Sequence, residues 1–507
     1  MEKSKVMEII SDETLTYSQQ VLALARLAES EDKTLSRNPL WIKALKEGKV
    51  CDLNEGLAPY RPRYILPNYS LLMKNGCVFL ELEPAKNILE ACNNLLIFYK
   101  HVPSITSYPV YLGNFTDIFE PFENEADSPQ TKEILRLFLK HIDKTLCDSF
   151  VHANIGPKDS KITRIILDLT KEMQLAIPNI TLLYDKDITP HDLAIASIDT
   201  MLATSKPSFA NHKMYSAEHK DIPYAIASCY NALNIGGGGY TLPRLRLYEI
   251  STEAKDIDDF FNNVLPKYVN LILEIIDQRI KFIVEDSSFF KSNFLLKEGF
   301  VEREKFTGMV GLVGVAECVN TLLGIKDKEK GFGHNIEALK LADRVLKAIE
   351  DQVNAHHGLY CSKCDNHYLM HAQVGIDSDG TDNSPGCRVP IGYEPDLFEH
   401  LQIESTLHKY FPCGVGDIFK FDQTWLNSKE AILDIINGSF EKGMRYFTAY
   451  NCDNDVVRVT GYLVKKSEID KLTNGKQSIN NCTIFGKGAK EKGKALDRKI
   501  YGTSTDK

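Results

Sequence analysis

The stretch Val456–Leu463 contains one residue that could carry unusual chemistry, a glycine at position 461 between β-branched and aromatic neighbours. A glycine in such a strand usually marks a bulge, a bend or the close approach of another part of the chain. Because Gly461 has no side chain, a radical on its Cα could also lie flat between the adjoining amides, which would spread the unpaired spin. Gly461 is therefore either an ordinary bend or a backbone site that can store an unpaired electron.

Four consecutive glycines, Gly236–Gly239, form a second unusual segment. They give up side-chain contacts and lose much backbone entropy on folding, so packing alone does not explain them. They indicate that another group approaches the backbone closely, either a phosphate or, in a tight loop, the protein itself. The Lys-Ser/Thr pair that completes a phosphate-binding loop is missing, which weakens the phosphate interpretation.

Cys361 and Cys364 form a Cys-x-x-Cys pair with the spacing of half a tetrahedral zinc site. His367, His371 and Cys387 follow within reach of the pair in sequence. Two reduced thiols are the default interpretation, and zinc bound by Cys361, Cys364 and two other ligands is the alternative. A redox role, returning electrons to a substrate, is a third interpretation.

Composition excludes some classes of function. The net charge of −9 and the pI near 5.9 give no basic field that would hold a phosphate backbone, so we expect no nucleic acid partner. No apolar export signal follows Met1, so the twelve cysteines are expected to be reduced in the cytoplasm. The apolar stretch 306–325 is expected to be a buried helix rather than a membrane span.

The periodicity of apolar residues predicts a mixed α/β protein. A short apolar strand at 177–183 is followed by a helix that begins at Thr189-Pro190, which is the rhythm of a parallel βα unit. We expect a mainly helical N-terminal part at 1–155, a catalytic part at 156–450 and a C-terminal region at 451–507. The pattern further predicts helices at 88–99, 128–145, 162–174, 308–320, 335–353 and 440–450, and a strand at 108–118.

The segment Arg458–Tyr462 resembles the Arg-Val-(Ser/Thr)-Gly-Tyr signature of glycyl radical enzymes. Leu472 and the Gln-Ser-Ile at 477–479 also stand where that family has a leucine and a Gln-x-Ile pair. The resemblance implies that Gly461 stores the radical. The rest of the radical loop would be Arg458, Val459, Thr460 and Tyr462.

The same family places a cysteine on a finger loop beside the radical glycine, and Cys229, which precedes the glycine-rich segment, is the matching residue. The resemblance implies a thiyl radical on Cys229; the alternative is a structural thiol. Candidates for lining the pocket are Asn231, Tyr240 and Glu317. An acid in so apolar a segment as 308–320 needs a partner or a polar cavity, and a helix-end salt bridge is the alternative for Glu317.

The resemblance also implies a fold, partners and cofactors. The fold would be an α/β barrel of ten strands, built from two antiparallel five-stranded parallel halves, with helices outside and the Cys and Gly loops meeting inside. A radical S-adenosylmethionine activating enzyme would generate the radical in anaerobic metabolism, and the active protein would be sensitive to oxygen. We expect a small-molecule substrate, no membrane partner and no bound cofactor besides the glycyl radical, and leave open a homodimer.

The branch of the family is less sharply defined. Formate-lyase relatives have two adjacent cysteines, where this chain has Tyr230 after Cys229, and radical eliminases have Cys-x-Glu, where it has Asn231. The chain as a whole is similar to the YjjI-type glycyl radical enzymes. The segments Leu242–Leu247 and 311–317 resemble anaerobic ribonucleotide reductases, so nucleotide reduction is one alternative function. A non-catalytic scaffold stabilised by zinc is the alternative from another class.

Overall fold

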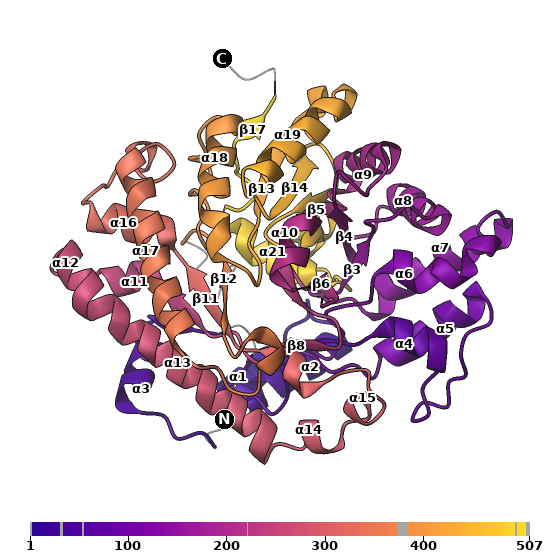
Figure 1. The fold of residues 1–507 in the computed structure, drawn as a ribbon, viewed down its shortest axis with the longest axis horizontal. Coiled ribbons are helices and arrows are strands. Elements are labelled where there is room, and N and C mark those ends of the chain that lie inside the picture. The colour runs from indigo at the N-terminus through magenta and orange to yellow at the C-terminus, as the bar shows by residue number, and fades with distance from the viewer. Residues whose placement is uncertain are drawn as a thin grey trace.

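The computed structural model describes residues 3–30, 34–52, 55–220, 222–372, 383–491 and 494–502. Strands lie near the centre of the molecule and helices surround them (Figure 1). The first 150 residues contribute mostly helices. These are α1 (Lys3–Ile10), α2 (Tyr17–Ser30), α3 (Pro39–Lys46), α4 (Tyr69–Asn75), α5 (Ile88–Tyr99), α6 (Phe115–Phe119) and α7 (Pro129–Thr145).

The largest sheet has six strands in the order β17-β13-β14-β5-β4-β3. The strands β3, β4 and β5 are parallel to one another, as are β14, β13 and β17, and the two sets meet at an antiparallel pairing of β14 with β5. Their bounds are β3 (His152–Ile155), β4 (Asn179–Tyr184), β5 (Ser208–Asn211), β13 (Asp417–Phe421), β14 (Tyr446–Asn451) and β17 (Ile500–Tyr501).

The local sequence explains the β3-to-β5 part of this sheet. Helix α8 (Lys161–Met173) begins where the Ser160 side chain accepts a hydrogen bond from the Thr163 amide, and it buries Ile162 and Ile166 on one face. All six residues of β4 are buried, as expected for a strand covered on both faces. Helix α9 (His191–Thr204) then returns the chain to β5. The predicted βα rhythm is confirmed here.

Two smaller sheets lie beside the six-stranded one. The first has the order β1-β9-β11-β12 and the second β10-β8-β2. The strands are β1 (Val50–Cys51), β9 (Arg244–Arg246), β11 (Met309–Val313), β12 (Leu369–Ala372), β10 (Phe306–Thr307), β8 (Gly237–Gly239) and β2 (Tyr64–Leu66). Over the described residues the strands form separate sheets, so the mixed α/β class is confirmed, whereas the closed ten-stranded barrel is not.

Two hairpins complete the strands, and both carry residues of the candidate site. They are β6 (Tyr224–Ala227) with β7 (Asn231–Asn234), and β15 (Val456–Arg458) with β16 (Leu463–Lys465). The remaining helices are α10 (His212–Glu218), α11 (Leu247–Ser251), α12 (Ile257–Asp259), α13 (Leu265–Lys281), α14 (Phe289–Ser292), α15 (Phe294–Lys297), α16 (Val315–Leu322), α17 (Ile336–Ala355), α18 (Leu397–Leu407), α19 (Lys429–Glu441), α20 (Lys466–Thr473) and α21 (Asn481–Glu491).

Several predicted elements are wrong. The expected helix within 306–325 is instead β10 and β11 followed by α16, because Gly311 lets β11 pack directly on the Arg244 side chain of β9. The expected helix at 440–450 contains the end of α19 and the strand β14, which is buried between β13 and β5. The strand expected at 108–118 does not form: residues 108–113 are irregular, Asn114 makes only an isolated bridge to Asn154, and α6 begins at Phe115.

The glycine-rich segment is a strand rather than the expected loop. Gly237–Gly239 form β8, which lies between β10 and β2. A methyl group on Gly238 would lie 1.9 Å from the carbonyl oxygen of Tyr64, and φ of Gly238 is +155°. The close approach inferred from the glycines is therefore that of neighbouring backbone.

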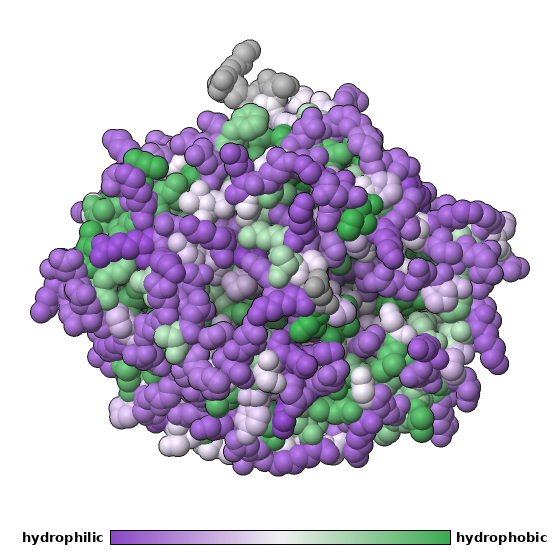
Figure 2. Space-filling view, viewed as in Figure 1, coloured by the Kyte–Doolittle hydropathy of each residue, from purple (hydrophilic) through white to green (hydrophobic). Residues whose placement is uncertain are grey.

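No helix in the described ranges is both long enough and apolar enough to cross a membrane. The face in Figure 2 is mostly hydrophilic, with hydrophobic residues in scattered patches. Most of the stretch 306–320 is buried, including every residue of β11, whereas residues 321–325 are exposed or half-buried.

We predict that Gly238→Ala destabilises the protein by about 3 kcal/mol, because the new methyl group would overlap the Tyr64 carbonyl and strain the backbone. The matched control is Gly438→Ala in α19, where a methyl group would meet nothing within 4 Å. It should stabilise by up to about 1 kcal/mol. Urea unfolding of both variants measures the difference, and equal midpoints would contradict the role assigned to Gly238.

Candidate active site

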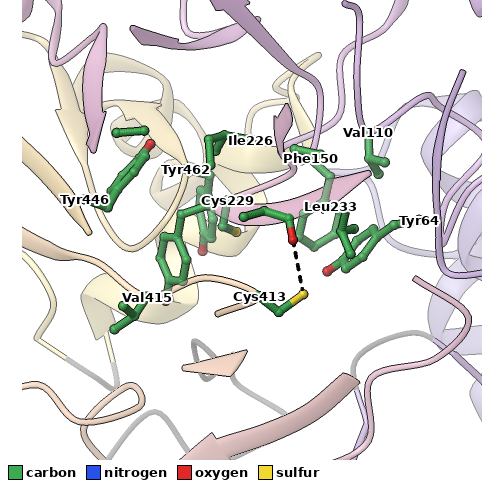
Figure 3. Packing of buried hydrophobic residues seen from close by; sticks show 14 of the residues in the cluster. Tyr64, Val110, Phe150, Ile226, Cys229, Leu233, Cys413, Val415, Tyr446 and Tyr462 are labelled. Carbon is green, nitrogen blue, oxygen red and sulfur yellow. Dashed lines mark hydrogen bonds between the residues drawn. The ribbon is translucent and has the colours of Figure 1, made fainter. Parts of the chain in front are cut away.

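The two hairpins bring Cys229 and Gly461 into contact. Cys229 lies in the turn between β6 and β7, and Gly461 lies in the loop between β15 and β16. A methyl group in place of a Gly461 hydrogen would lie 2.2 Å from Cβ and 2.8 Å from Sγ of Cys229. Both residues are buried, and Figure 3 shows Cys229 among Tyr462, Tyr446 and Leu233. Residues 232 positions apart in the chain are thus in van der Waals contact, which is the distance needed for hydrogen-atom transfer.

Arg458 fixes the glycine loop from within. Its guanidinium donates to the Gly461 carbonyl (3.3 Å) and to the Ser205 carbonyl (2.8 Å). It also donates to Oδ1 of Asn179 (3.0 Å), whose amide nitrogen in turn donates to the Gly461 carbonyl (3.1 Å). Burial lowers the pKa of Arg458 to about 10. The arginine of the predicted loop therefore positions the backbone of Gly461.

The other residues of the loop are buried with it. Val459 accepts a hydrogen bond at its carbonyl from Arg498 (2.9 Å), and its amide donates to the Tyr462 carbonyl (3.3 Å). Thr460 is 5 % exposed. The ring of Tyr462 packs against Phe485 of α21 with 6.2 Å between centroids. The loop is closed on one side by this C-terminal helix.

The cysteine hairpin is held at its turn by two contacts. Ser228 has φ of +55° and donates its amide to the Val110 carbonyl (3.0 Å). A ring nitrogen of His152 lies 2.5 Å from the Ser228 carbonyl, and the other lies 2.8 Å from the Thr181 hydroxyl. Burial lowers the pKa of His152 to about 3, so its imidazole is neutral at physiological pH. These contacts place Cys229 against the glycine loop.

Burial raises the pKa of Cys229 to about 11, although Ser228 and the arginines Arg63, Arg458 and Arg388 act in the opposite direction. The residue is therefore a thiol rather than a thiolate near neutral pH. A thiolate would suit nucleophilic or metal chemistry. A protonated sulfur retains the hydrogen atom that one-electron chemistry requires.

Of the three predicted pocket residues, only Asn231 lies beside the cysteine. Its amide nitrogen donates to the Ala227 carbonyl across the hairpin (3.1 Å). Tyr240 instead has its hydroxyl 2.9 Å from the Tyr360 carbonyl, in the three-stranded region. Glu317 accepts from the amide and hydroxyl of Ser384 (3.0 and 2.6 Å), not from a cationic group, and burial raises its pKa. The contacts of Tyr240 and Glu317 in the described chain include neither Cys229 nor Gly461.

Sequence reasoning missed the side chains that surround Tyr230. The ring of His371 stacks on that of Tyr230 with 5.6 Å between centroids and 13° between planes. The Arg388 guanidinium lies 5.6 Å from the Tyr230 centroid. His371 belongs to β12 and Arg388 precedes α18, so no spacing pattern joins them to Cys229. His371 was noted only as a neighbour of the Cys-x-x-Cys pair.

The described residues include two groups of three potential metal ligands, and neither contains Cys361 or Cys364. Cys364 accepts a hydrogen bond from the Asn234 amide (3.4 Å), and burial raises the pKa of both thiols. The groups that do occur are Cys387, Glu404 and His408, and His400, Glu404 and Asp417. Their hydrogen bonds already pair His408 with Glu404 (2.8 Å) and His400 with Asp417 (2.7 Å). Two reduced thiols remain the prediction for Cys361 and Cys364, with zinc as the alternative.

Comparison with solved structures identifies the fold. The anaerobic ribonucleotide reductase from Thermotoga maritima with glycerol in the active site is similar at a TM-score of 0.68 and 13% identity, over 97% of this chain and 87% of that chain. A structure from work on 1,2-propanediol dehydration in Roseburia inulinivorans is similar at 0.68 and 10%, over 98% and 88%. The chain thus has the α/β fold of the glycyl radical enzymes.

The family is set by sequence. A model of the family described as "Glycyl radical enzyme YjjI-like" matches residues 15–501. A protein from Haemophilus influenzae is 42% identical over 501 residues, which cover 98% of this chain and 97% of that protein. The chain belongs to the YjjI-like glycyl radical enzyme family.

We predict that Gly461→Ala is destabilising, although φ of Gly461 is not in the left-handed region, because its methyl group would overlap Cβ of Cys229. The cost should be about 2 kcal/mol or more. Cys229→Gly in the same chain removes the overlapping atoms and should recover part of it, so a double-mutant cycle of unfolding free energies should show coupling. Strictly additive changes in unfolding free energy would contradict the contact between Gly461 and Cys229.

A second prediction concerns pH. Burial, assisted by Arg63 and Arg244, lowers the pKa of His371 from 6.5 to about 3. Below pH 6.5 the unfolded chain takes up a proton that the folded protein does not, so stability is lost as the pH falls. From about pH 7 to about pH 5 this one histidine should account for up to about 2 kcal/mol.

His371→Phe should therefore flatten the dependence of unfolding free energy on pH over this range. His191→Phe, at a position whose side chain is 66% exposed, controls for the loss of a histidine from the surface. Denaturant unfolding at intervals of pH gives both slopes. A slope equal to that of the wild type in His371→Phe would contradict the assignment.

Proposed function

We propose that the protein is an oxygen-sensitive enzyme that stores a radical on Gly461 and uses a thiyl radical on Cys229 to abstract hydrogen from a small molecule. The observation that carries this proposal is the contact of Gly461 with Cys229, since a methyl group on the glycine would lie 2.8 Å from the sulfur. Membership of the YjjI-like family supports it. The protonated state of the buried thiol supports it further.

The proposed sequence of hydrogen transfers balances at each step. A radical S-adenosylmethionine activating enzyme supplies an adenosyl radical, which takes one hydrogen atom from the Gly461 Cα and leaves as the closed-shell nucleoside. The glycyl radical then takes the hydrogen atom of the Cys229 thiol, which leaves a thiyl radical. That radical takes a hydrogen atom from a substrate C–H bond, and after the substrate radical has reacted, the same atom returns. Because Gly461 is buried, the glycine loop must be exposed to the activating enzyme first.

Nucleotide reduction is the alternative reaction, since the Thermotoga maritima structure of similar fold is an anaerobic ribonucleotide reductase. At 13% identity that likeness concerns the fold alone, and the Roseburia inulinivorans structure, from work on dehydration, is equally similar. We therefore leave the fate of the substrate radical open. The zinc-stabilised scaffold gives no reason for Cys229 and Gly461 to be in contact.

Anaerobic activation should produce an electron paramagnetic resonance doublet, split by the one hydrogen left on the Gly461 Cα. The doublet should be absent from Gly461→Ala and present in Gly438→Ala, a glycine with open space around it. Because Gly461→Ala also perturbs packing, protein grown with α-deuterated glycine is a second test, in which the splitting should collapse without any substitution. Exposure of the activated protein to air should cleave the chain at Gly461, as mass spectrometry would reveal. An intact chain from a demonstrably activated sample would falsify the proposal.

The role of Cys229 can be tested without a known substrate. In heavy water the thiol carries deuterium, and repeated transfer between sulfur and the Gly461 Cα should replace the remaining α hydrogen. The wild-type doublet should then become a singlet, whereas Cys229→Ser should keep its doublet, because the oxygen–hydrogen bond is too strong to exchange in this way. Cys413→Ser, at a buried thiol that donates to the Ala232 carbonyl (3.5 Å, Figure 3), is the matched control and should behave as the wild type.

A further inference from the structure

Three buried side chains form a cluster directly after the reactive cysteine. The ring of Tyr230 is at its centre, with His371 stacked on it and the Arg388 guanidinium 5.6 Å from its centroid. The exposed fractions are 1% for Tyr230, 2% for His371 and 3% for Arg388. Tyr230 is fixed by a hydrogen bond from its hydroxyl to the Ala372 carbonyl (2.8 Å). The cluster is therefore a buried group of polar side chains that begins one residue from Cys229.

The His371 side chain is buried without hydrogen-bond partners in the described chain. Neither of its ring nitrogens hydrogen bonds to any part of the chain that the structure describes. Buried polar atoms are nearly always paired, and leaving a donor and an acceptor unpaired is costly. A neutral imidazole offers one donor and one acceptor. Its two nitrogens are thus suited to a ligand that both accepts and donates hydrogen bonds, such as a hydroxy acid.

Arg388 is held in place with part of its donor capacity left over. Its Nε donates to the Gly416 carbonyl (2.5 Å) and lies 3.5 Å from Oδ1 of Asp417. Asp417 is itself held by His400 (2.7 Å). The Nη1 group of Arg388 is buried and has no hydrogen-bond partner within the described ranges. A guanidinium is always charged and binds carboxylate and phosphate oxygens well. Nη1 is therefore a preorganised hydrogen-bond donor for an anion.

The charge around Cys229 is positive as well. Arg458 is completely buried, and its hydrogen bonds in the described chain go to the neutral groups of Asn179, Ser205 and Gly461. A buried cation with only neutral partners is expensive unless a negative charge comes near. The acids that act on Arg388 are Asp417 and Glu404, and burial raises the pKa of Glu404, which favours its neutral form. A cationic substrate would be repelled at this position, and an anionic one attracted.

We infer that Arg388 and His371 are the substrate-binding residues of the site and that the substrate is a small organic anion, whose carboxylate or phosphate oxygens lie beside Tyr230 within reach of Cys229. That the bound anion is a substrate rests on the proposed function. The binding itself requires no radical, so it can be tested in the unactivated protein.

The decisive measurement compares ligands that differ in charge and not in shape. Lactate and lactamide are such a pair, and inorganic phosphate provides the phosphate arm. Each is titrated into unactivated protein at constant ionic strength and followed by ligand-observed NMR and calorimetry. We expect lactate or phosphate to bind at least about ten-fold more tightly than lactamide. The arm that binds more tightly distinguishes a carboxylate from a phosphate group.

Variants then locate the binding. Arg388→Gln should weaken anion binding by about ten-fold or more, and Arg388→Lys, which retains the charge, should weaken it less. His371→Phe should weaken it, and His371→Asn, which keeps a donor and an acceptor, should restore part. Arg136→Gln removes an arginine that is 36% exposed and paired with Glu133, and it should change nothing. Circular dichroism and melting temperature identify any variant that does not fold.

Three outcomes would overturn the inference. The first is equal binding of lactate and lactamide. The second is anion binding that survives both Arg388→Gln and His371→Phe in folded protein. The third is no binding of either lactate or phosphate, which would mean that ordered water alone satisfies these groups. None of them would affect the glycyl doublet or its deuterium exchange. Failure of this inference is therefore distinguishable from failure of the proposed radical chemistry.

Discussion

The structure depends on one contact, that of a sulfur atom with a backbone carbon that has no side chain. Any substituent on Gly461 would occupy the space taken by Cβ and Sγ of Cys229. The contact requires two hairpins from distant parts of the chain to meet inside the protein with their turns facing each other. Glycine is therefore needed at 461 for steric reasons alone, before any argument about how well its Cα accommodates a radical.

The contact is maintained by buried polar groups whose burial is itself unfavourable. Arg458 gives up solvation in order to hold the Gly461 carbonyl together with Asn179, and burial lowers its pKa to about 10. His152 is neutral for the same reason and holds the turn that carries Cys229. These groups act on the backbone of the two loops, so they fix positions and not merely side-chain orientations. The same exclusion of water keeps Cys229 protonated.

Local patterns in the sequence predicted the parts of the fold that local interactions decide. The amphipathic helices α5, α7, α8 and α17 and the buried strand β4 lie close to their expected positions. The predictions failed at 306–325 and 440–450, where apolar residues suit a helix or a buried strand equally and the choice was made by neighbouring strands. The glycines at 237–239 were correctly associated with close approach, but a sequence does not reveal that the approaching group is another strand.

The residues of the candidate site also divide into those that the sequence could predict and those that it could not. Gly461, Arg458 and Cys229 could be found because each lies in a short segment whose composition is unusual. The cluster around Tyr230 is assembled from separate parts of the chain. His371 lies on β12 and Arg388 lies before α18, and the tertiary fold brings both to Tyr230. Structures associated with ribonucleotide reduction and with propanediol dehydration share this fold at equal similarity. The fold and the proposed radical loops therefore do not distinguish one substrate from another, and under the proposed function that selection falls to side chains of the second kind.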